Sequence, residues 1–182
     1  MTTREEPEAA PARAGLSGGV LSGLFVVVVV VGVLIASLGG DASVAEVGGP
    51  APALAINTFD GEVFDLVDHV RFDRGPVLVN LWASWCEPCK REFPVLSEFA
   101  TAHPDVTVVG IAVQDQLESA RAFVADNDPS FTVGFDADGT VRDTYPSFGL
   151  PATFVIDRHG TVVDIILAEL TEERMASISF EG

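Results

Sequence analysis

Two cysteines separated by two residues are the most distinctive chemical feature of the sequence. Cys86 and Cys89 close the segment Trp82-Ala-Ser-Trp-Cys-Glu-Pro-Cys89, which stands between an apolar run and a helical pattern. Cysteines at this spacing can close a small disulfide, and the amides and dipole at the start of a helix stabilise a thiolate at Cys86. We therefore expect Cys86 to attack a disulfide of a partner and Cys89 to resolve the mixed disulfide, which leaves the partner reduced.

A metal site and an inert structural disulfide are the alternative interpretations of the pair. A zinc site needs four protein ligands, or three and a water, and His69, His103 and His159 stand at no regular spacing from the cysteines. A disulfide that closes so short a loop removes little entropy from the unfolded chain, so a purely stabilising role is a poor explanation. The pattern favours redox chemistry and predicts no metal and no cofactor other than the Cys86–Cys89 disulfide.

Two acids and two tryptophans stand near the pair. Glu87 lies between the cysteines, where its charge disfavours a thiolate and makes the pair a weaker oxidant. Glu92 follows Cys89 by three residues on the same face of the expected helix, close enough to couple to its protonation or to bind a substrate. A solvated helix acid without a role is the alternative for Glu92. Trp82 and Trp85 are expected to be core and packing residues.

Four apolar runs predict the strands that frame these residues. The run that directly precedes the cysteines is apolar almost throughout and is typical of a central strand buried on both faces. The turn signal Asp60-Gly61 predicts a short hairpin at the edge of the domain. The four runs occupy residues 77–82, 106–112, 152–156 and 162–167, and the hairpin joins 54–57 to 63–65.

Three further segments predict helices. Apolar residues at helical spacing predict a helix from Pro88 to His103, with the cysteines at its first turn. The pattern Asp115-x-x-Glu118 resembles the capping box that starts a helix, and Thr171 opens a last short helix. The element order β-α-β-α-β-β-α predicts an α/β fold with a mixed central sheet flanked by helices.

Length and charge narrow the class of protein. The chain has 182 residues, which fits one compact domain with an appendage. Ten basic residues against 27 acidic ones give a net charge of −17, so nucleic acids and anionic lipid surfaces should repel the protein. Nucleic-acid binding is therefore excluded as a function.

An apolar segment near the N-terminus predicts a membrane anchor. Residues 14–40 carry no charge and include the unbroken run Val26–Val31. The segment is longer than the apolar region of a signal peptide and long enough to cross a membrane, so we expect an uncleaved transmembrane helix over residues 14–38. A cleaved signal peptide, with small residues at Ser43-Val-Ala45 for the cut, is the alternative.

Basic residues close to the expected span give its orientation. Arg4 and Arg13 precede the span, and none follows it closely, which predicts a cytoplasmic tail at 1–13 and an extracytoplasmic domain in a single-pass cell-membrane protein. Residues 39–52 are rich in glycine and proline and predict a flexible linker, followed by the folded domain at 53–182.

Two motifs in the domain resemble those of a known family. They are Val77-Leu-Val-Asn-Leu-Trp-Ala-Ser-Trp-Cys-Glu-Pro-Cys-Lys-Arg-Glu-Phe-Pro94 and Gly149-Leu-Pro-Ala-Thr-Phe-Val-Ile-Asp157. Together they resemble the extracytoplasmic, membrane-anchored thioredoxin-like family of the ResA, TlpA and CcmG type, over residues 48–178. The resemblance implies a thioredoxin-like fold, a redox pair at Cys86 and Cys89, and a cis-proline at Pro151. The backbone near Leu150 and Pro151 would bind an extended substrate chain.

The resemblance also implies partners and supporting residues. The motif places Trp85 beside the pair as a supporting residue, in addition to Glu87 with its charge, and Glu92 matches an active-site glutamate. Asn80 stands where cytoplasmic thioredoxins carry an aspartate beneath the pair, which makes Glu92 the substitute for that acid. The implied partners are protein thiols and disulfides, with the Cys-x-x-Cys-His haem-attachment disulfide of apocytochrome c as the specific expectation, and a membrane protein that donates electrons.

Three other functions remain open alternatives. A disulfide oxidase or isomerase of the DsbA type would use the same pair in the opposite direction if its thiolate were strongly stabilised. A copper metallochaperone would use the cysteines as soft ligands. A peroxidase ranks last, because Ala83 replaces the threonine of a Thr-x-x-Cys pattern. Since no unexplained apolar helix stripe remains outside the anchor, we expect a monomer.

Overall fold

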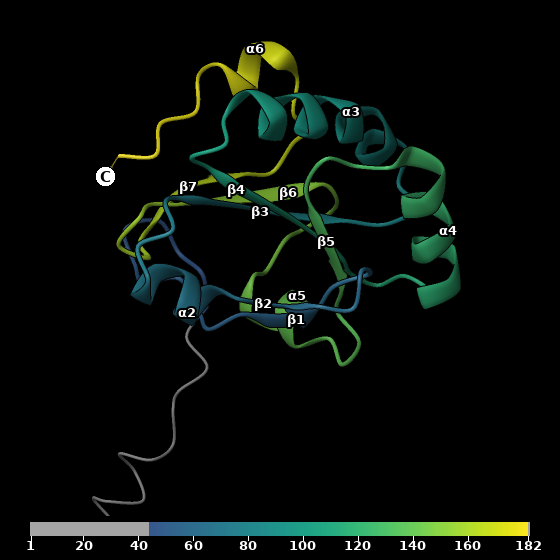
Figure 1. Cartoon of the computed structure of the whole chain (residues 1–182), viewed down its shortest axis with the longest axis horizontal. Helices are drawn as coiled ribbons and strands as arrows, with labels where there is room; N and C mark the ends of the chain where they lie inside the picture. Colours follow the sequence, from purple (N-terminus) through teal and green to yellow (C-terminus); the bar gives the residue numbers. More distant parts are fainter. Residues whose placement is uncertain (1–43, 182) are drawn as a thin grey trace, which may run out of the picture. The chain divides into compact units, whose positions relative to one another are not determined.

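A five-stranded mixed sheet forms the centre of the computed structural model, which describes residues 44–181 of the chain (Figure 1). The strand order is β5-β4-β3-β6-β7. Strands β3, β4 and β5 are parallel, whereas β6 is antiparallel to its two neighbours, β3 and β7. The strands are β3 (Val77–Trp82), β4 (Thr107–Ala112), β5 (Thr132–Phe135), β6 (Ala152–Ile156) and β7 (Val162–Ile166).

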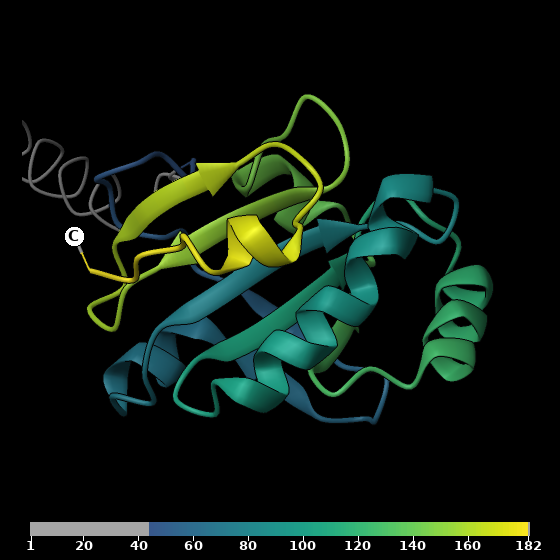
Figure 2. The same ribbon diagram turned by 90° about the horizontal axis from the view of Figure 1, so that it is seen from above.

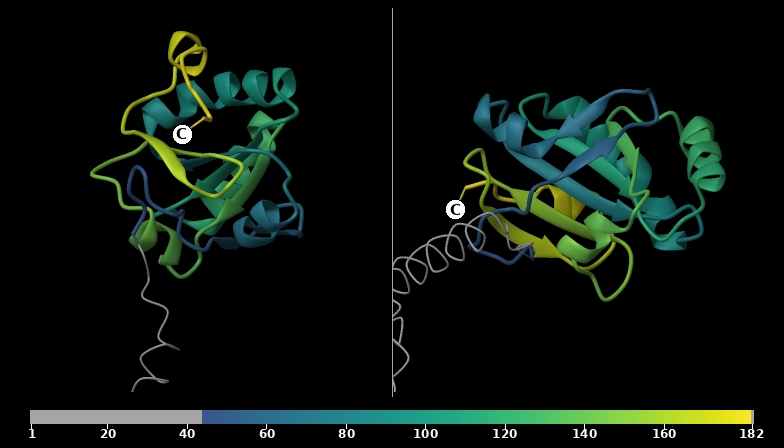
Figure 3. Two further views of the ribbon diagram at one scale, coloured as in Figure 1. Left: turned by 90° about the vertical axis from the view of Figure 1, so that its left-hand side faces the viewer. Right: turned by 90° about the horizontal axis from the view of Figure 1, so that it is seen from below.

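Helices and a hairpin cover the two faces of this sheet (Figure 1 and the left panel of Figure 3). Helices α3 (Glu87–Ala102) and α6 (Glu172–Met175) lie over one face, as the view from above shows (Figure 2). The opposite face carries α5 and the antiparallel hairpin β1-β2, which continues into α2. These elements are β1 (Ala55–Asn57), β2 (Val63–Asp65), α2 (Leu66–Arg71) and α5 (Thr140–Thr144), and α4 (Leu117–Asn127) flanks the sheet.

Strand β3 is buried on both faces because its side chains alternate between two hydrophobic clusters. Val79 and Leu81 pack with residues of the hairpin side such as Ile56. Leu78 packs with Leu96 of α3 on the other face. Asn80 is two residues after Leu78 and its side chain therefore points to the same face of the sheet, the one that α3 covers.

The structure confirms most elements expected from the sequence. The hairpin, the central strand, the helix after the cysteines and the Thr171 cap are all present, with the Thr171 hydroxyl accepting from the Arg174 amide. Three elements escaped the sequence analysis, namely α2, β5 and α5. The predicted cap of α4 is wrong: Gln116 is the N-cap residue, because the Asp115 carboxylate is bound to Ser84.

Part of the expected flexible linker is packed against the domain. Residues 44–52 form backbone hydrogen bonds with the sheet region, including those from the Ala45 amide to the Thr144 carbonyl and between Gly48 and Val162. Ala45 is buried, and the Tyr145 hydroxyl donates to the Pro52 carbonyl at 2.6 Å. Glycine and proline therefore serve here to fit the chain closely along the domain, instead of leaving it free.

The predicted tail at 1–13, the anchor at 14–38 and the first part of the linker lie outside the described residues. Within the described part of the chain, no helix is long and apolar enough to span a membrane.

Candidate active site

The two cysteines meet at the junction between the central strand and α3. They form a disulfide with an S–S distance of 2.04 Å and a Cα–Cα distance of 5.3 Å. Cys86 is the N-cap residue of α3, and its Sγ accepts a hydrogen bond from the Cys89 amide at 3.3 Å. Cys86 is 4% exposed and Cys89 is fully buried, so Cys86 is the member that a partner reaches first. The helix start supplies the amide that can stabilise a Cys86 thiolate.

Glu87, the acid between the cysteines, is paired with a cation. Lys90 Nζ lies 2.6 Å from Glu87 Oε1, one helical turn further on. The hydrogen bond and the charge of Lys90 lower the pKa of Glu87, so Glu87 is ionised when the protein acts near neutral pH. The Lys90 charge partly cancels the negative field that Glu87 would otherwise impose on the cysteines.

Glu92 is buried completely, which the interpretation as a solvated helix acid does not allow. Its Oε1 accepts from Asn80 Nδ2 and its Oε2 accepts from the Leu170 amide, both at 2.8 Å. Asn80 Nδ2 also donates to Thr153 Oγ1 at 3.0 Å, on the neighbouring strand β6. Burial raises the pKa of Glu92 to about 7, against the two hydrogen bonds, which lower it. The side chain can therefore hold or release a proton near neutral pH, on the same helix as Cys89.

The tryptophan next to the cysteines lies on the surface, which corrects the expectation that both tryptophans are core residues. Trp82 is fully buried, as expected, but Trp85 is 58% exposed. The Trp85 indole donates to the Gln114 carbonyl at 3.0 Å, so its polar edge is satisfied while its apolar faces meet solvent. Ser84 is bound to Asp115, which fixes the segment from Ser84 to Cys86 against the end of β4.

A groove opens beside the cysteines. The Leu150–Pro151 peptide bond is cis, which confirms the expectation for Pro151. The groove has a volume of about 410 Å³ and is reached by Pro88, the residue between the two cysteines. Phe148 is fully exposed and Leu167 is 52% exposed, so the rim presents apolar surface to solvent. The lining residues are Pro88, Phe148, Gly149, Leu150, Pro151, Leu167, Ala168 and Glu169.

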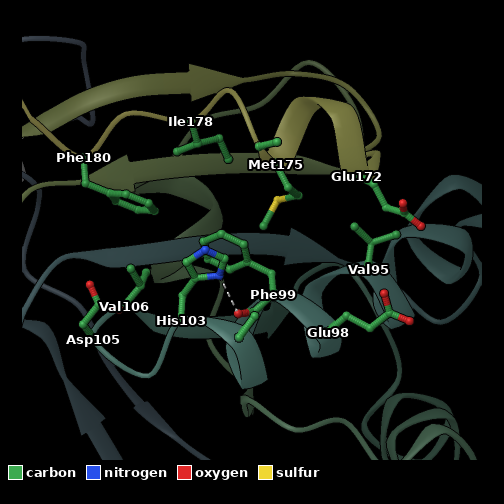
Figure 4. A pocket seen from close by; sticks show the side chains of 12 residues that line it. Val95, Glu98, Phe99, His103, Asp105, Val106, Glu172, Met175, Ile178 and Phe180 are labelled. Carbon is green, nitrogen blue, oxygen red and sulfur yellow. Dashed lines mark hydrogen bonds between the residues drawn. The ribbon is translucent and has the colours of Figure 1, made fainter.

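Another cavity, of about 550 Å³, lies between α3 and the C-terminal segment, away from the cysteines (Figure 4). Apolar side chains such as Phe99, Met175 and Phe180 line it, with Glu98 and Glu172 at one end. Among residues 44–181, no group of three or more His, Cys, Asp and Glu side chains is arranged to hold a metal ion. Both cysteines of the chain lie at the start of α3, away from this cavity.

The partners that hold these groups are not predicted by the sequence. The pattern at Asp115 predicts a helix cap instead, and no pattern predicts a role for Phe148, Leu167, Arg91 or Glu169. Phe148 stands three residues before the cis-proline, directly before the second motif, and that position was the available signal. The other partners become visible only when distant segments are brought together.

A disulfide at the start of the helix that follows the central strand, facing a cis-proline loop on a mixed sheet, defines a thioredoxin-like thiol-disulfide oxidoreductase. The sequence model of the AhpC/TSA family matches residues 47–165, and the chain belongs to this family. Its thioredoxin-like fold and its enzyme class agree with those of the relatives described next.

Similar proteins are oxidoreductases of the ResA and DsbE type. The thiol-disulfide oxidoreductase ResA of Bacillus thuringiensis subsp. konkukian is 30% identical over 132 residues, which span 71% of this chain and 75% of the relative. The DsbE homolog of Paracoccus denitrificans, a thiol:disulfide interchange protein, is 34% identical over 120 residues, or 65% of either chain. The crystal structure of a secreted Mycobacterium tuberculosis disulfide oxidoreductase homologous to E. coli DsbE matches with a TM-score of 0.58 and 28% identity, over 69% of this chain and 96% of that one.

Proposed function

We propose that this protein is a membrane-anchored, extracytoplasmic reductant of protein disulfides, with the Cys-x-x-Cys-His disulfide of apocytochrome c as its substrate. The observation that carries the proposal is the combination of the helix-start disulfide with the buried acid Glu92. A buried carboxyl that titrates near neutral pH suits a reaction in which a thiol must lose its proton before it attacks.

The proposed reaction starts from the reduced pair. The Cys86 thiolate attacks one sulfur of the substrate disulfide, so that a mixed disulfide forms and the second substrate sulfur leaves as a thiolate. Glu92 then accepts the proton of the Cys89 thiol, directly or through a water. The Cys89 thiolate attacks Cys86, which forms the Cys86–Cys89 disulfide and releases the first substrate sulfur. The substrate gains two electrons and this protein loses two.

The groove beside Pro151 is the proposed binding site for the substrate chain. Backbone at Leu150 and Pro151 would pair with an extended peptide that carries the target disulfide. Phe148 and Leu167 supply apolar surface at the rim, and Trp85 supplies more beside Cys86. Exposed apolar patches of this kind are typical of sites that bind another chain. The proposed role of Trp85 is therefore substrate contact, with Glu87 tuning the pair.

The proposed location rests on the sequence before the domain. The uncharged segment at 14–38 would cross the membrane with the tail at 1–13 in the cytoplasm. The domain would then meet its substrates outside the cytoplasm and receive electrons from a membrane protein. A test is to express the full chain and to add a protease to cells whose outer envelope has been removed but whose cytoplasmic membrane is intact. We expect the domain to be cleaved under these conditions and the uncleaved anchor to remain in the membrane fraction.

The redox potential of the pair tests the direction of the reaction. The full-length protein in detergent would be equilibrated with glutathione buffers and its free thiols would be alkylated and counted. A reductant is expected to have a potential near or below about −250 mV, whereas a value near about −120 mV would make the protein a disulfide oxidase. A peptide with an oxidised Cys-x-x-Cys-His segment then tests the substrate. An equal rate with a scrambled peptide of the same composition would overturn the apocytochrome assignment.

A further inference from the structure

Two neighbouring residues of α3 are bound by two neighbouring residues of the loop between β7 and α6. Arg91 donates from Nε and Nη2 to the two carboxylate oxygens of Glu169, at 3.0 and 2.5 Å. Glu92, the next residue of the helix, accepts from the amide of Leu170, the next residue of the loop. One surface ion pair and one buried hydrogen bond therefore join the same two segments side by side.

The two contacts differ in environment. The Arg91 and Glu169 side chains are 59% and 29% exposed, whereas Glu92 and Leu170 are buried. An exposed ion pair contributes little to global stability, but a bidentate guanidinium–carboxylate pair fixes geometry well. The loop leads into α6, which spans only four residues and cannot hold the loop in place by its own helical stability.

We propose that Arg91 and Glu169 are positioning residues for Glu92, because their ion pair holds the β7–α6 loop where the Leu170 amide meets the Glu92 carboxylate. The Arg91–Glu169 ion pair is called the latch below. The inference rests on the proposed role of Glu92 in catalysis. It assigns a task to an exposed arginine that touches neither cysteine in any hydrogen bond of the described structure.

The groups that face Glu92 determine how a loss of the Arg91–Glu169 ion pair would change the pKa of Glu92. Asn80 of β3 and the Leu170 amide of the loop lower the pKa of Glu92, while burial and the charge of Glu169 raise it. Thr153 of β6 accepts a hydrogen bond from the same Asn80 amide group, and Cys89 on α3 is neutral in the disulfide. Without Arg91, the Glu169 charge is no longer neutralised and the amide is held less firmly. Both changes raise the Glu92 pKa.

The latch also connects the acid to the groove. Leu167, Ala168 and Glu169 belong to the loop and line the groove beside Pro151. A substrate chain that displaces this loop, or competes for Glu169, would change the hydrogen bonding of Glu92 at the same time. The loop thereby links occupancy of the groove to proton transfer at the buried acid.

Titration of Glu92 itself tests the inference without relying on activity. The oxidised full-length protein in detergent, labelled with 13C at glutamate carboxyls, would be titrated by NMR, with Glu92→Gln to assign the Glu92 signal. We expect Arg91→Ala to move the midpoint upward by about half a pH unit or more. Arg91→Lys, which keeps the charge but loses the bidentate geometry, should give a smaller shift. Arg142→Ala is the control, since it removes another exposed ion pair, with Asp143, on α5.

An unchanged Glu92 midpoint in Arg91→Ala would overturn the latch. The pH profile of peptide reduction by the reduced protein separates this outcome from failure of the proposed function. If Glu92→Gln leaves that profile unchanged while Arg91→Ala still moves the Glu92 midpoint, the latch stands and the catalytic role of Glu92 falls. If Arg91→Ala moves both the midpoint and the profile in the same direction, both inferences are supported.

Discussion

Ser84 donates its backbone amide to Asp115 Oδ2 at 2.5 Å and its hydroxyl to Asp115 Oδ1 at 3.0 Å. These residues follow adjacent parallel strands, whose last residues, Trp82 and Ala112, are paired in register. The two turns are therefore tied together directly before the redox pair. The Trp85 indole adds a further hydrogen bond to the same turn. The segment that leads to Cys86 is therefore held in place before a substrate binds.

Replacing Asp115 by alanine should loosen this turn. The two hydrogen bonds from Ser84 are lost, together with the one from the Gln116 amide, and the Ser84 amide is left without its partner. We therefore expect the free energy of unfolding of the oxidised protein to fall by about 2 kcal/mol. Urea unfolding followed by fluorescence measures this change. Asp164→Ala is the matched control. Asp164, like Asp115, accepts from the amide of the next residue, but its only side-chain hydrogen bond among the described residues is this local one, whereas Asp115 also binds Ser84. Equal losses in both variants would contradict the role of Asp115.

The raised pKa of Glu92 predicts a stability that depends on pH. Because the folded protein holds the Glu92 proton up to about pH 7 and the unfolded chain releases it near its ordinary pKa of 4.5, the folded state binds more protons between these values. Stability from this group is fully present below about pH 4.5 and is lost as pH rises to about 7, by an amount of about 3 kcal/mol.

The Glu92→Gln variant isolates this effect. It keeps one of the two acceptor oxygens that Asn80 and Leu170 bind, and it cannot ionise. The difference in unfolding free energy between the variant and the parent protein should therefore grow as pH rises from about 4.5 to 7 and stay constant above. Urea unfolding at several pH values measures the difference. A difference that is independent of pH would show that Glu92 titrates at its ordinary pKa, which would remove the basis for its proposed role.

The Glu87–Lys90 pair predicts a small adjustment of the redox equilibrium. Glu87→Gln removes a negative charge between the cysteines and leaves the Lys90 charge unpaired, and both changes favour a thiolate. The disulfide should become more oxidising, with an equilibrium constant against glutathione changed about two- to threefold, which is about 10 mV. Lys90→Ala should act in the opposite direction. Glu98→Gln, on the same helix but far along it, should leave the potential unchanged.

The fold could be predicted from the sequence where one residue pattern determines one element. Strand β3 has apolar residues on both faces, and α3 follows it with a regular stripe, so both were predicted with nearly correct bounds. In contrast, α2 and α5 span six and five residues, too few to show helical periodicity. Strand β5 has four residues around Gly134, whose missing side chain makes room for Ile56. Only the packed structure shows why a glycine belongs there.

The redox pair could likewise be predicted, but its partners could not. The spacing of Cys86 and Cys89 and their place at a helix start are local features. Asp115 stands 31 residues from Ser84, and its local pattern equally suits a helix cap. Trp85 is apolar and was therefore expected inside, whereas its contact with the Gln114 carbonyl keeps it at the surface. Such contacts depend on the pairing of β3 with β4, which no single segment encodes.

The exposed apolar side chains at the groove predict that truncating one of them weakens substrate binding without changing the stability of the protein. Phe148 is fully exposed, so Phe148→Ala should leave the stability of the protein unchanged. If the ring is buried by a bound substrate chain, its loss should raise KM for a disulfide peptide about tenfold, with kcat changed little. Phe72→Ala is the control, because Phe72 is 59% exposed but does not line the groove. A KM that is the same in the parent protein and both variants would show that the substrate binds elsewhere around Cys86.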